Sequence, residues 1–286
     1  MLRYFCIIYD IVFDAIEHFM EEDGWAMASH ISLSTLLSIF PFIFFGANLA
    51  GFLGAHQFVA TVMDVLFSTW PEVIAKPITD EILQVLSMPK KGLFTISALV
   101  SAYFSSNGIE ALRVSLNRAY RVVELRSWYV TRLISLGYVL LSAFILTIVS
   151  FVFVNIPLAL AYVKEFSPSF GNFLLIIWNG RVYGTIFVIF LGLIFVHLFL
   201  PAGNRMIYSI LPGIIFTWIS WLVGAFLFAH YIIAFSNYSA IYAGLASITI
   251  FLVFLYILGV IFIFGAELNA SIMINYWRKN YDYDDI

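Results

Sequence analysis

Charged residues are scarce in this sequence, and their scarcity decides the class of protein. Only 11% of the 286 residues are Asp, Glu, Lys or Arg, against about 25% in soluble domains. The sixty-one residues between Arg205 and Glu267 include none of these four types. A helix needs about 20 predominantly apolar residues to cross a hydrocarbon core of about 30 Å. The stretch therefore predicts two transmembrane helices joined by a turn near residues 236–239, and it excludes an ordinary soluble fold.

Cysteine and catalytic motifs are also scarce. Cys6 is the only cysteine, which excludes an intrachain disulfide. The sequence has no HExxH, Walker A or GxSxG motif and no nucleic-acid-binding module. Its five histidines lack the spacing of metal ligands. We therefore expect no enzyme activity, no cofactor, no metal ion and no nucleic-acid partner. The acidic N-terminus has no basic leader before an apolar core, so no secretory signal is expected.

Long apolar segments are abundant, since 63% of the residues are hydrophobic. They predict an all-α polytopic membrane protein with six transmembrane helices and additional amphipathic interfacial helices. We expect an amphipathic N-terminal helix (1–24), a six-span membrane domain (25–275) and a cytoplasmic tail (276–286). Two short amphipathic pieces within residues 56–91 are expected to lie on the membrane surface. The expected spans are residues 25–53, 92–109, 133–162, 182–200, 209–235 and 241–272.

The N-terminal helix has two different faces at helical spacing. One face is acidic and the other is apolar. We expect the helix to lie on the membrane surface or to pack against the other helices, and its acidic face argues against binding anionic lipid headgroups. The acidic face contains Asp10, Asp14, Glu17 and Glu21, and the apolar face contains Phe5, Ile8, Val12, Ile16 and Phe19.

The basic residues predict that both termini are cytoplasmic. With the N-terminus inside and six crossings, nine basic residues fall on the cytoplasmic side and five on the outer side, which agrees with the positive-inside rule. The loop between the second and third spans contributes most to this difference. The inside residues are Arg3, Arg113, Arg118, Arg121, Arg126, Arg132, Arg205, Arg278 and Lys279, and the outside residues are Lys76, Lys90, Lys91, Lys164 and Arg181.

Pro41 lies near the middle of the first expected span. Proline has no backbone N–H, so the carbonyl of Leu37 loses its helical donor and a kink is expected there. Ser34 and Ser38 lie just before the proline and can compensate for the lost hydrogen bond. We expect this bend to have a structural or gating role.

The segment NGIEALRVSLNRAYRVVELR, residues 107–126, carries the densest polar pattern in the chain. Its polar side chains share one side of a helix, so the second span is expected to continue beyond the membrane as an amphipathic helix. Two interpretations stay open. The polar side is a solvated face with a Glu110–Arg113 or Glu110–Arg121 ion pair, or it lines the cytoplasmic mouth of a cavity. The polar side consists of Asn107, Glu110, Arg113, Asn117 and Arg121.

Glu267, in the segment GAELNA, lies near the cytoplasmic end of an otherwise apolar helix. An ionisable side chain at mid-bilayer costs roughly 2.5 to 3.5 kcal/mol and less toward the surface, so it is usually turned inward and paired. The partner is a structural arginine of residues 113–126, or Glu267 is a carboxylate coupled to a substrate or a proton. We predict that Glu267, Arg113 and Asn117 lie close together, with at least one Glu–Arg contact.

These segments resemble a known family. LSTLLSIFPFIFF around Pro41, the segment 107–126 with its LNRAY, and YSAIYAGLASITIFLVFLYILGVIFIFGAELNA are similar to the YihY/BrkB family of bacterial inner-membrane proteins, over about residues 10–275. The chain departs from the family at Ala243, because the family commonly has Tyr-Gly and Gly244 here comes one place later, which shifts the expected turn. The family long carried the label ribonuclease BN, which the residues do not support.

The resemblance, with its links to virulence, serum resistance and envelope lipids, implies a transporter or flippase-like protein for a lipid or amphipathic anion. In this hypothesis Arg113 and Arg121, beside Asn117, hold a phosphate-like group through charge-assisted hydrogen bonds. Glu110 and Glu267 orient these arginines or couple to protons. A membrane scaffold and a ribonuclease are the alternatives, and the oligomeric state is open. Structural or gating roles are expected for Pro41, Asn107, Gly244 and Asn269.

Overall fold

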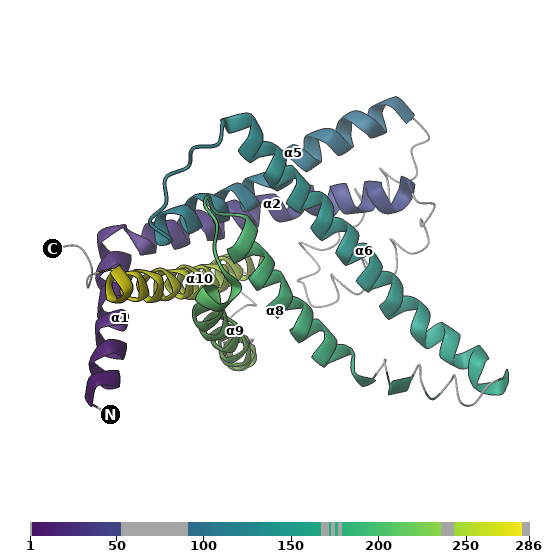
Figure 1. The fold of residues 1–286 in the computed structure, drawn as a ribbon. Coiled ribbons are helices and arrows are strands. Elements are labelled where there is room, and N and C mark those ends of the chain that lie inside the picture. Colours follow the sequence, from purple (N-terminus) through teal and green to yellow (C-terminus); the bar gives the residue numbers. More distant parts are fainter. Residues whose placement is uncertain are drawn as a thin grey trace.

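The computed structural model describes residues 2–52, 91–166, 172, 175–176, 179–235 and 243–281, and the regular structure in these residues is helical. The expected turn at 236–239 and all but residue 91 of the expected surface segment at 56–91 lie outside the described residues. Figure 1 shows the helices in chain order. They are α1 (Leu2–Glu21), α2 (Gly24–Phe52), α5 (Lys91–Ala119), α6 (Trp128–Phe166), α8 (Arg181–Phe199), α9 (Ile207–Phe235) and α10 (Ala243–Tyr281).

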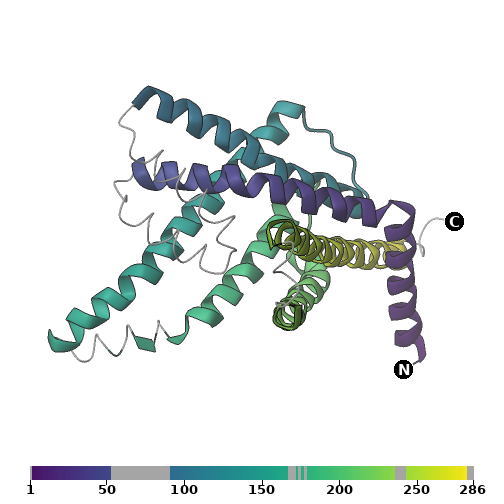
Figure 2. The same ribbon diagram turned by 180° about the vertical axis from the view of Figure 1, so that it is seen from behind.

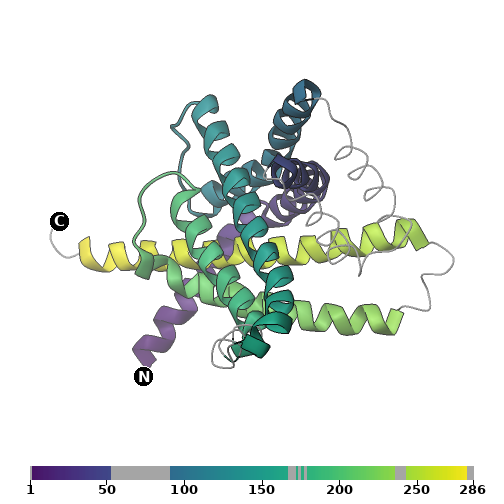
Figure 3. The ribbon, with the colours of Figure 1, turned by 90° about the vertical axis from the view of Figure 1, so that its right-hand side faces the viewer.

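The helices associate largely as pairs. α2 runs beside α5, and α9 runs beside α10 (Figures 1 and 3). The two pairs cross, since α10 is foreshortened in Figure 1, where α2 runs across the page, whereas in Figure 3 α10 runs across the page and α2 is seen nearly end-on. α10 also packs on α1 and α2, and α6 packs on α5. The contacts between α2, α5 and α10 form the centre of the molecule.

Four described helices are long and apolar enough to cross a membrane. α8 is apolar but shorter, over Tyr183–Phe199. Within the described residues α5 is not among these four helices, and its apolar half includes Ser101, Ser105, Ser106 and Asn107. The first, third, fifth and sixth expected spans are thus supported, while the count of six is not established by the helices themselves. The four segments are Gly24–Gly46, Trp128–Ile148, Ile207–Phe228 and Ile248–Asn275.

The helix of the second expected span continues past Glu110 to Ala119, which confirms that it extends beyond residue 109. The N-terminal helix is also confirmed, but the side chains of its expected apolar face are not all buried. Phe19 is buried, whereas Ile8, Val12 and Ile16 are exposed. The prediction placed these residues on one stripe, and the difference arises because only part of that stripe packs against α10.

α2 continues as one helix through Pro41, so the bend predicted there stays a prediction. Ser38 has a different role from the one expected. Its hydroxyl accepts a hydrogen bond from the backbone N–H of Gly108 at 2.9 Å and donates to the carbonyl of Phe104 at 3.4 Å. A Cβ on Gly108 would lie 3.3 Å from Ser38. Ser38 therefore joins α2 to α5 at a close approach of the two helices.

α9 and α10 approach each other even more closely. A Cβ on Gly213 would overlap the carbonyl oxygen of Gly265 and lie 2.7 Å from the side chain of Asn269. The backbone N–H of Gly213, just after Pro212, donates to Oδ1 of Asn269 at 2.7 Å. Asn269 thus satisfies a backbone donor next to the proline, as polar side chains do in membrane helices.

Candidate functional site

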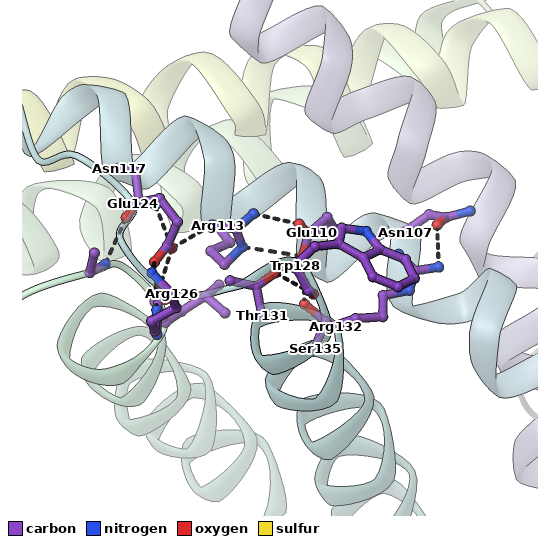
Figure 4. Close-up of polar contacts among 12 residues, drawn as sticks. Asn107, Glu110, Arg113, Asn117, Glu124, Arg126, Trp128, Thr131, Arg132 and Ser135 are labelled. Carbon is purple, nitrogen blue, oxygen red and sulfur yellow. Dashed lines mark hydrogen bonds and ion pairs between the residues drawn. The ribbon is translucent and has the colours of Figure 1, made fainter.

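The polar side chains form three adjoining clusters where α5 ends, α6 and α9 begin, and α10 approaches its end. The arginine–glutamate cluster consists of Glu110, Arg113, Asn117, Glu124 and Arg126 (Figure 4). The α1 clasp consists of Asp14, His18, Arg121, Glu267 and Ser271. The tyrosine cluster consists of Tyr120, His197, Arg205 and Asn269.

Arg113 is the centre of the arginine–glutamate cluster. Its Nε donates to Glu110 at 3.2 Å, its Nη2 also donates to Glu110, and its Nη1 donates to Glu124. Asn117 donates to Glu124 at 3.0 Å, and Ser135 donates to Glu110 at 2.9 Å. Figure 4 shows these side chains pointing toward one another between α5, α6 and the connecting loop. The buried guanidinium of Arg113 is therefore neutralised by two carboxylates.

Glu124, in the loop between α5 and α6, receives most of the donors. Both nitrogens Nε and Nη2 of Arg126 donate to it at 2.7 Å, and the backbone N–H of Arg126 donates at 3.1 Å. The hydrogen bonds from Arg126 outweigh the opposing effect of burial and lower the pKa of Glu124 to about 2. Glu124 is therefore ionised at neutral pH.

The cluster extends in two directions. Arg132 of α6 donates to Oδ1 of Asn107 at 2.8 Å (Figure 4), and it also donates to the carbonyl of Tyr103 at 2.9 Å. In the other direction, Oδ1 of Asn117 accepts from the backbone N–H of Ala202 at 2.7 Å. Arg126 also donates to the carbonyl of Leu200 at 3.1 Å. These bonds fix the α8–α9 loop on the end of α5.

The α1 clasp joins the first and last helices of the chain. Nδ1 of His18 lies 2.9 Å from Oε2 of Glu267, whose side chain is fully buried. Nη2 of Arg121 donates to Asp14 at 2.7 Å and lies 3.8 Å from Glu267. Ser271 donates to Asp14 at 2.6 Å. α1 is thereby held by two side chains one helical turn apart.

The charges around α1 have defined protonation states. Burial tends to raise the pKa of Asp14, but hydrogen bonds from Arg121 and Ser271 outweigh it, so the pKa lies below its usual value. Burial and then the positive charge of Arg121 lower the pKa of His18. At neutral pH Asp14 is therefore ionised and His18 is neutral.

Arg121 is placed by an unusual backbone conformation. Its φ is +57°, in the left-handed region that favours glycine. Val122 N–H donates to the carbonyl of Asn117 at 2.9 Å, and Arg121 N–H donates to that of Arg118 at 2.8 Å, which is the Schellman pattern of a helix C-terminus. A non-glycine residue here costs on the order of 1 kcal/mol. The strained backbone directs the Arg121 guanidinium toward Asp14 and Glu267.

Most side chains of the tyrosine cluster are buried. The hydroxyl of Tyr120 lies 2.7 Å from Nδ1 of His197 and accepts a hydrogen bond from Asn269 at 3.2 Å. The guanidinium of Arg205 stacks over the Tyr120 ring at 4.1 Å. Nε2 of His197 and two nitrogens of Arg205 are buried without a hydrogen-bond partner among the described residues. Arg205 thus carries a cationic head that no described carboxylate neutralises within salt-bridge distance.

The structure brings together some of the predicted site residues and separates others. The Glu110–Arg113 pair is present, and Glu267 contacts Arg121, an arginine of the predicted segment. No described hydrogen bond or ion pair joins Glu267 to Arg113 or Asn117, so the single predicted cluster is divided in two. The separation arises because Arg121 lies beyond the C-terminus of α5 and turns toward α1. Gly244 lies in the first turn of α10.

Sequence reasoning did not propose eight of the cluster members as site residues: Asp14, His18, Tyr120, Glu124, Arg126, His197, Arg205 and Ser271. Asp14 and His18 are spaced by four residues, which places them on one face of α1, and Tyr120 lies in LNRAY. Both features could have been recognised in the sequence. Within the described part of the chain, no group of three His, Cys, Asp or Glu side chains could hold a metal ion.

Comparisons with known proteins agree on a membrane protein family. The family model described as virulence factor BrkB matches residues 15–282. The putative ribonuclease-like protein YfkH of Bacillus subtilis is 28% identical over 253 residues, which cover 87% of this chain and 90% of the relative. A UPF0761 membrane protein of Alteromonas mediterranea is 27% identical over 270 residues, which cover 90% of this chain and 85% of the relative. No solved structure matches the chain.

Proposed function

This chain belongs to the virulence factor BrkB family of membrane proteins, and from that membership and its buried charges we propose a non-enzymatic transporter or flippase-like protein. The proposed substrate is a lipid or an amphipathic anion. The observation that supports the proposal most is Glu267, which is fully buried in the apolar segment Ile248–Asn275 and is paired with His18 and Arg121. Ionisable side chains in membrane helices are costly and mark substrate or proton paths more often than other positions do.

The proposed site uses carboxylates as exchangeable counter-ions. Arg113 and Arg121 are each held by acidic side chains in this structure. A phosphate-like group binds a guanidinium with the same bidentate geometry as a carboxylate. We propose that such a group displaces Glu124 from Arg113, or Asp14 from Arg121, while Glu110 and Glu267 keep the arginines oriented. Asn117 supplies an additional neutral donor.

The proposed location is the bacterial inner membrane, with six crossings and both termini in the cytoplasm. Three of the helices with a spanning segment begin with exposed aromatic side chains, which are typical of a membrane–water interface. These side chains are Trp25, Trp128, Tyr129 and Tyr208. In the proposed topology all of them lie at the cytoplasmic side, near the clusters. The excess of Lys and Arg in the same segments supports this orientation.

A membrane scaffold is the second candidate, and one observation favours it. The cations of the arginine–glutamate cluster and of the α1 clasp already have acidic partners, as expected for purely structural ion pairs. In this alternative the clusters fix the helices and no substrate binds to them. The two candidate functions predict different effects of removing the Arg113 side chain.

The test is lipid movement in vesicles containing purified protein. Fluorescent phosphatidylglycerol, which is anionic, and fluorescent phosphatidylcholine are placed in both leaflets, and external dithionite bleaches the outer one. We expect wild-type protein to make the inner-leaflet phosphatidylglycerol accessible. Arg113→Ala should abolish this, whereas Arg118→Ala, an exposed arginine of the same helix, should retain it. Wild-type vesicles that behave like protein-free vesicles would contradict transport of these lipids.

The level of the Arg113→Ala protein distinguishes a substrate-binding role of Arg113 from a purely structural role. If Arg113 is only structural, Arg113→Ala leaves Glu110 without its paired cation and Glu124 with Arg126 alone, and it lowers the protein level, since breaking a buried pair costs roughly 3 to 5 kcal/mol. If Arg113 holds substrate, transport falls further than the protein level does.

The absence of nuclease activity is part of the proposal. Purified protein assayed on RNA with divalent metal should show no activity above that of a Glu267→Ala control.

A further inference from the structure

α1 has three distinct sectors around its axis. Asp14, Ala15, His18 and Phe19 face α10 and are buried or half-buried. A second sector is acidic and exposed, and it contains Asp10, Glu17 and Glu21. The third sector is apolar and equally exposed. At 100° per residue it forms one continuous arc, which consists of Ile8, Tyr9, Val12, Phe13, Ile16 and Met20.

The side chains of this apolar arc are exposed, although Met20 contacts Trp25. Ile8 is 62% exposed and Phe13 is 53% exposed. Six large apolar side chains on one face of a single helix form a patch of the kind that marks contact with a membrane or another protein. The neighbouring surface of α2 indicates what contacts this arc.

The arc leads to the start of α2. Trp25, in the first turn of α2, donates its indole N–H to the sulfur of Met20 at 3.2 Å and packs edge-on against Phe19. Beyond Trp25 the exposed surface of α2 first includes Ala26, Ser29 and His30 and then becomes apolar at Leu33 and Leu37. This surface lies in the apolar segment Gly24–Gly46. The apolar arc of α1 therefore ends at Trp25, an aromatic residue suited to the membrane–water interface, at the start of this segment.

The direction of α1 agrees with this arrangement. α1 meets the start of α2 at a corner instead of extending its axis, and it packs on the last part of α10 (Figures 1 and 2). Where α2 crosses the bilayer, α1 consequently runs along the bilayer surface. An interfacial helix buries its apolar face by about 5–10 Å at the boundary between headgroups and acyl chains and turns its charged face to water.

We propose that α1 is an interfacial helix of this membrane protein. The arc from Ile8 to Met20 contacts acyl chains, the acidic sector faces the aqueous phase, and the clasp holds the sector with Asp14 and His18 on α10. The acidic sector makes neutral or zwitterionic lipid the preferred surface, because anionic headgroups are repelled. The proposal requires only membrane insertion and is independent of transport.

The experiment places an environment-sensitive fluorophore at single cysteines. In a Cys6→Ser background, Val12→Cys and Ile16→Cys sample the apolar arc, and Glu17→Cys is the matched control from the acidic sector. The labelled proteins are reconstituted in phosphatidylcholine vesicles. We expect blue-shifted emission and quenching by doxyl lipid at positions 12 and 16, and quenching by aqueous iodide at position 17. Gel filtration before reconstitution selects protein that elutes like wild type.

Two results would overturn the proposal. Iodide quenching at 12 and 16 as strong as at 17 would mean that the arc faces water. Protection of 12 and 16 from both quenchers would mean that protein covers the arc, and energy transfer between differently labelled molecules would identify a second copy as that protein. The two arc positions are independent, so failure of one variant to fold leaves the other decisive.

Discussion

Arg121 combines a backbone that favours glycine with a side chain that joins three helices. Its left-handed conformation ends α5, and its guanidinium contacts Asp14 of α1 and lies 3.8 Å from Glu267 of α10. Selection of arginine at such a position implies that the side chain contributes more than the backbone conformation costs. Strain of this kind concentrates at functional positions.

Arg121→Gly separates the two effects. The change relieves on the order of 1 kcal/mol of backbone strain but removes the cation between Asp14 and Glu267, so we expect a net loss of stability. Asp23→Gly is the matched control, since Asp23 also has a positive φ, of 54°, and is exposed. It should be neutral or slightly stabilising. Thermal unfolding in detergent measures both, and a higher melting temperature for Arg121→Gly would show that the clasp contributes little.

At the scale of elements, the loop between α5 and α6 depends on the charge of Glu124. The pKa of Glu124 is about 2 in the folded protein and 4.5 ordinarily. Because the folded value is lower, the stabilisation is fully present above about pH 4.5 and is lost as the pH falls toward 2. We expect wild type to unfold at a higher temperature than Glu124→Gln above pH 4.5, with the difference shrinking below it. Arg126→Gln removes the main cause of the lowered Glu124 pKa. In that background, the effect of Glu124→Gln on the unfolding temperature should depend much less on pH.

The contact between α9 and α10 depends on the absence of a side chain at Gly213. A Cβ there would overlap the carbonyl oxygen of Gly265 and crowd Asn269. We expect Gly213→Ala to destabilise the protein by roughly 1 to 3 kcal/mol or more, the range for overpacking. Gly224→Ala in the same helix is the control, because its Cβ would lie 4.0 Å from Ile261. Equal melting temperatures for the two variants would mean that the helices separate without cost.

The helices could largely be predicted from the sequence, but their partners could not. Apolar stretches of about 20 residues identify helices regardless of packing, so α2, α6, α9 and α10 were expected. The need of a buried carboxylate for a cation also predicted an arginine near Glu267. His18 was not predictable in this way, because its contact with Glu267 spans 249 residues and depends on how α1 docks. The left-handed conformation of Arg121 was not predictable either, since no glycine marks the end of α5.

For the whole molecule, the orientation in the membrane decides whether the clusters face the cytoplasm. Nine basic residues fall on the proposed inner side and five on the outer side. Five of the nine belong to residues 113–132, and four of these five side chains are engaged in the contacts described above. The arginines that determine topology are thus largely the arginines of the site. Reversing the orientation would place the whole candidate site on the opposite side of the membrane.

The final prediction is therefore a topology measurement. A reporter active only outside the cytoplasm, fused after Ile286, should be inactive, and the same reporter inserted near Ser169 should be active. The excess of Lys and Arg in the proposed inner segments is the physical basis. An active C-terminal fusion would mean an odd number of crossings. The short polar half of α5, with Ser105 and Asn107, would then be the first candidate for a helix that does not cross. Labelling of Arg118→Cys by a membrane-impermeant reagent would check this directly: an inner position stays unlabelled in intact cells and becomes labelled after lysis.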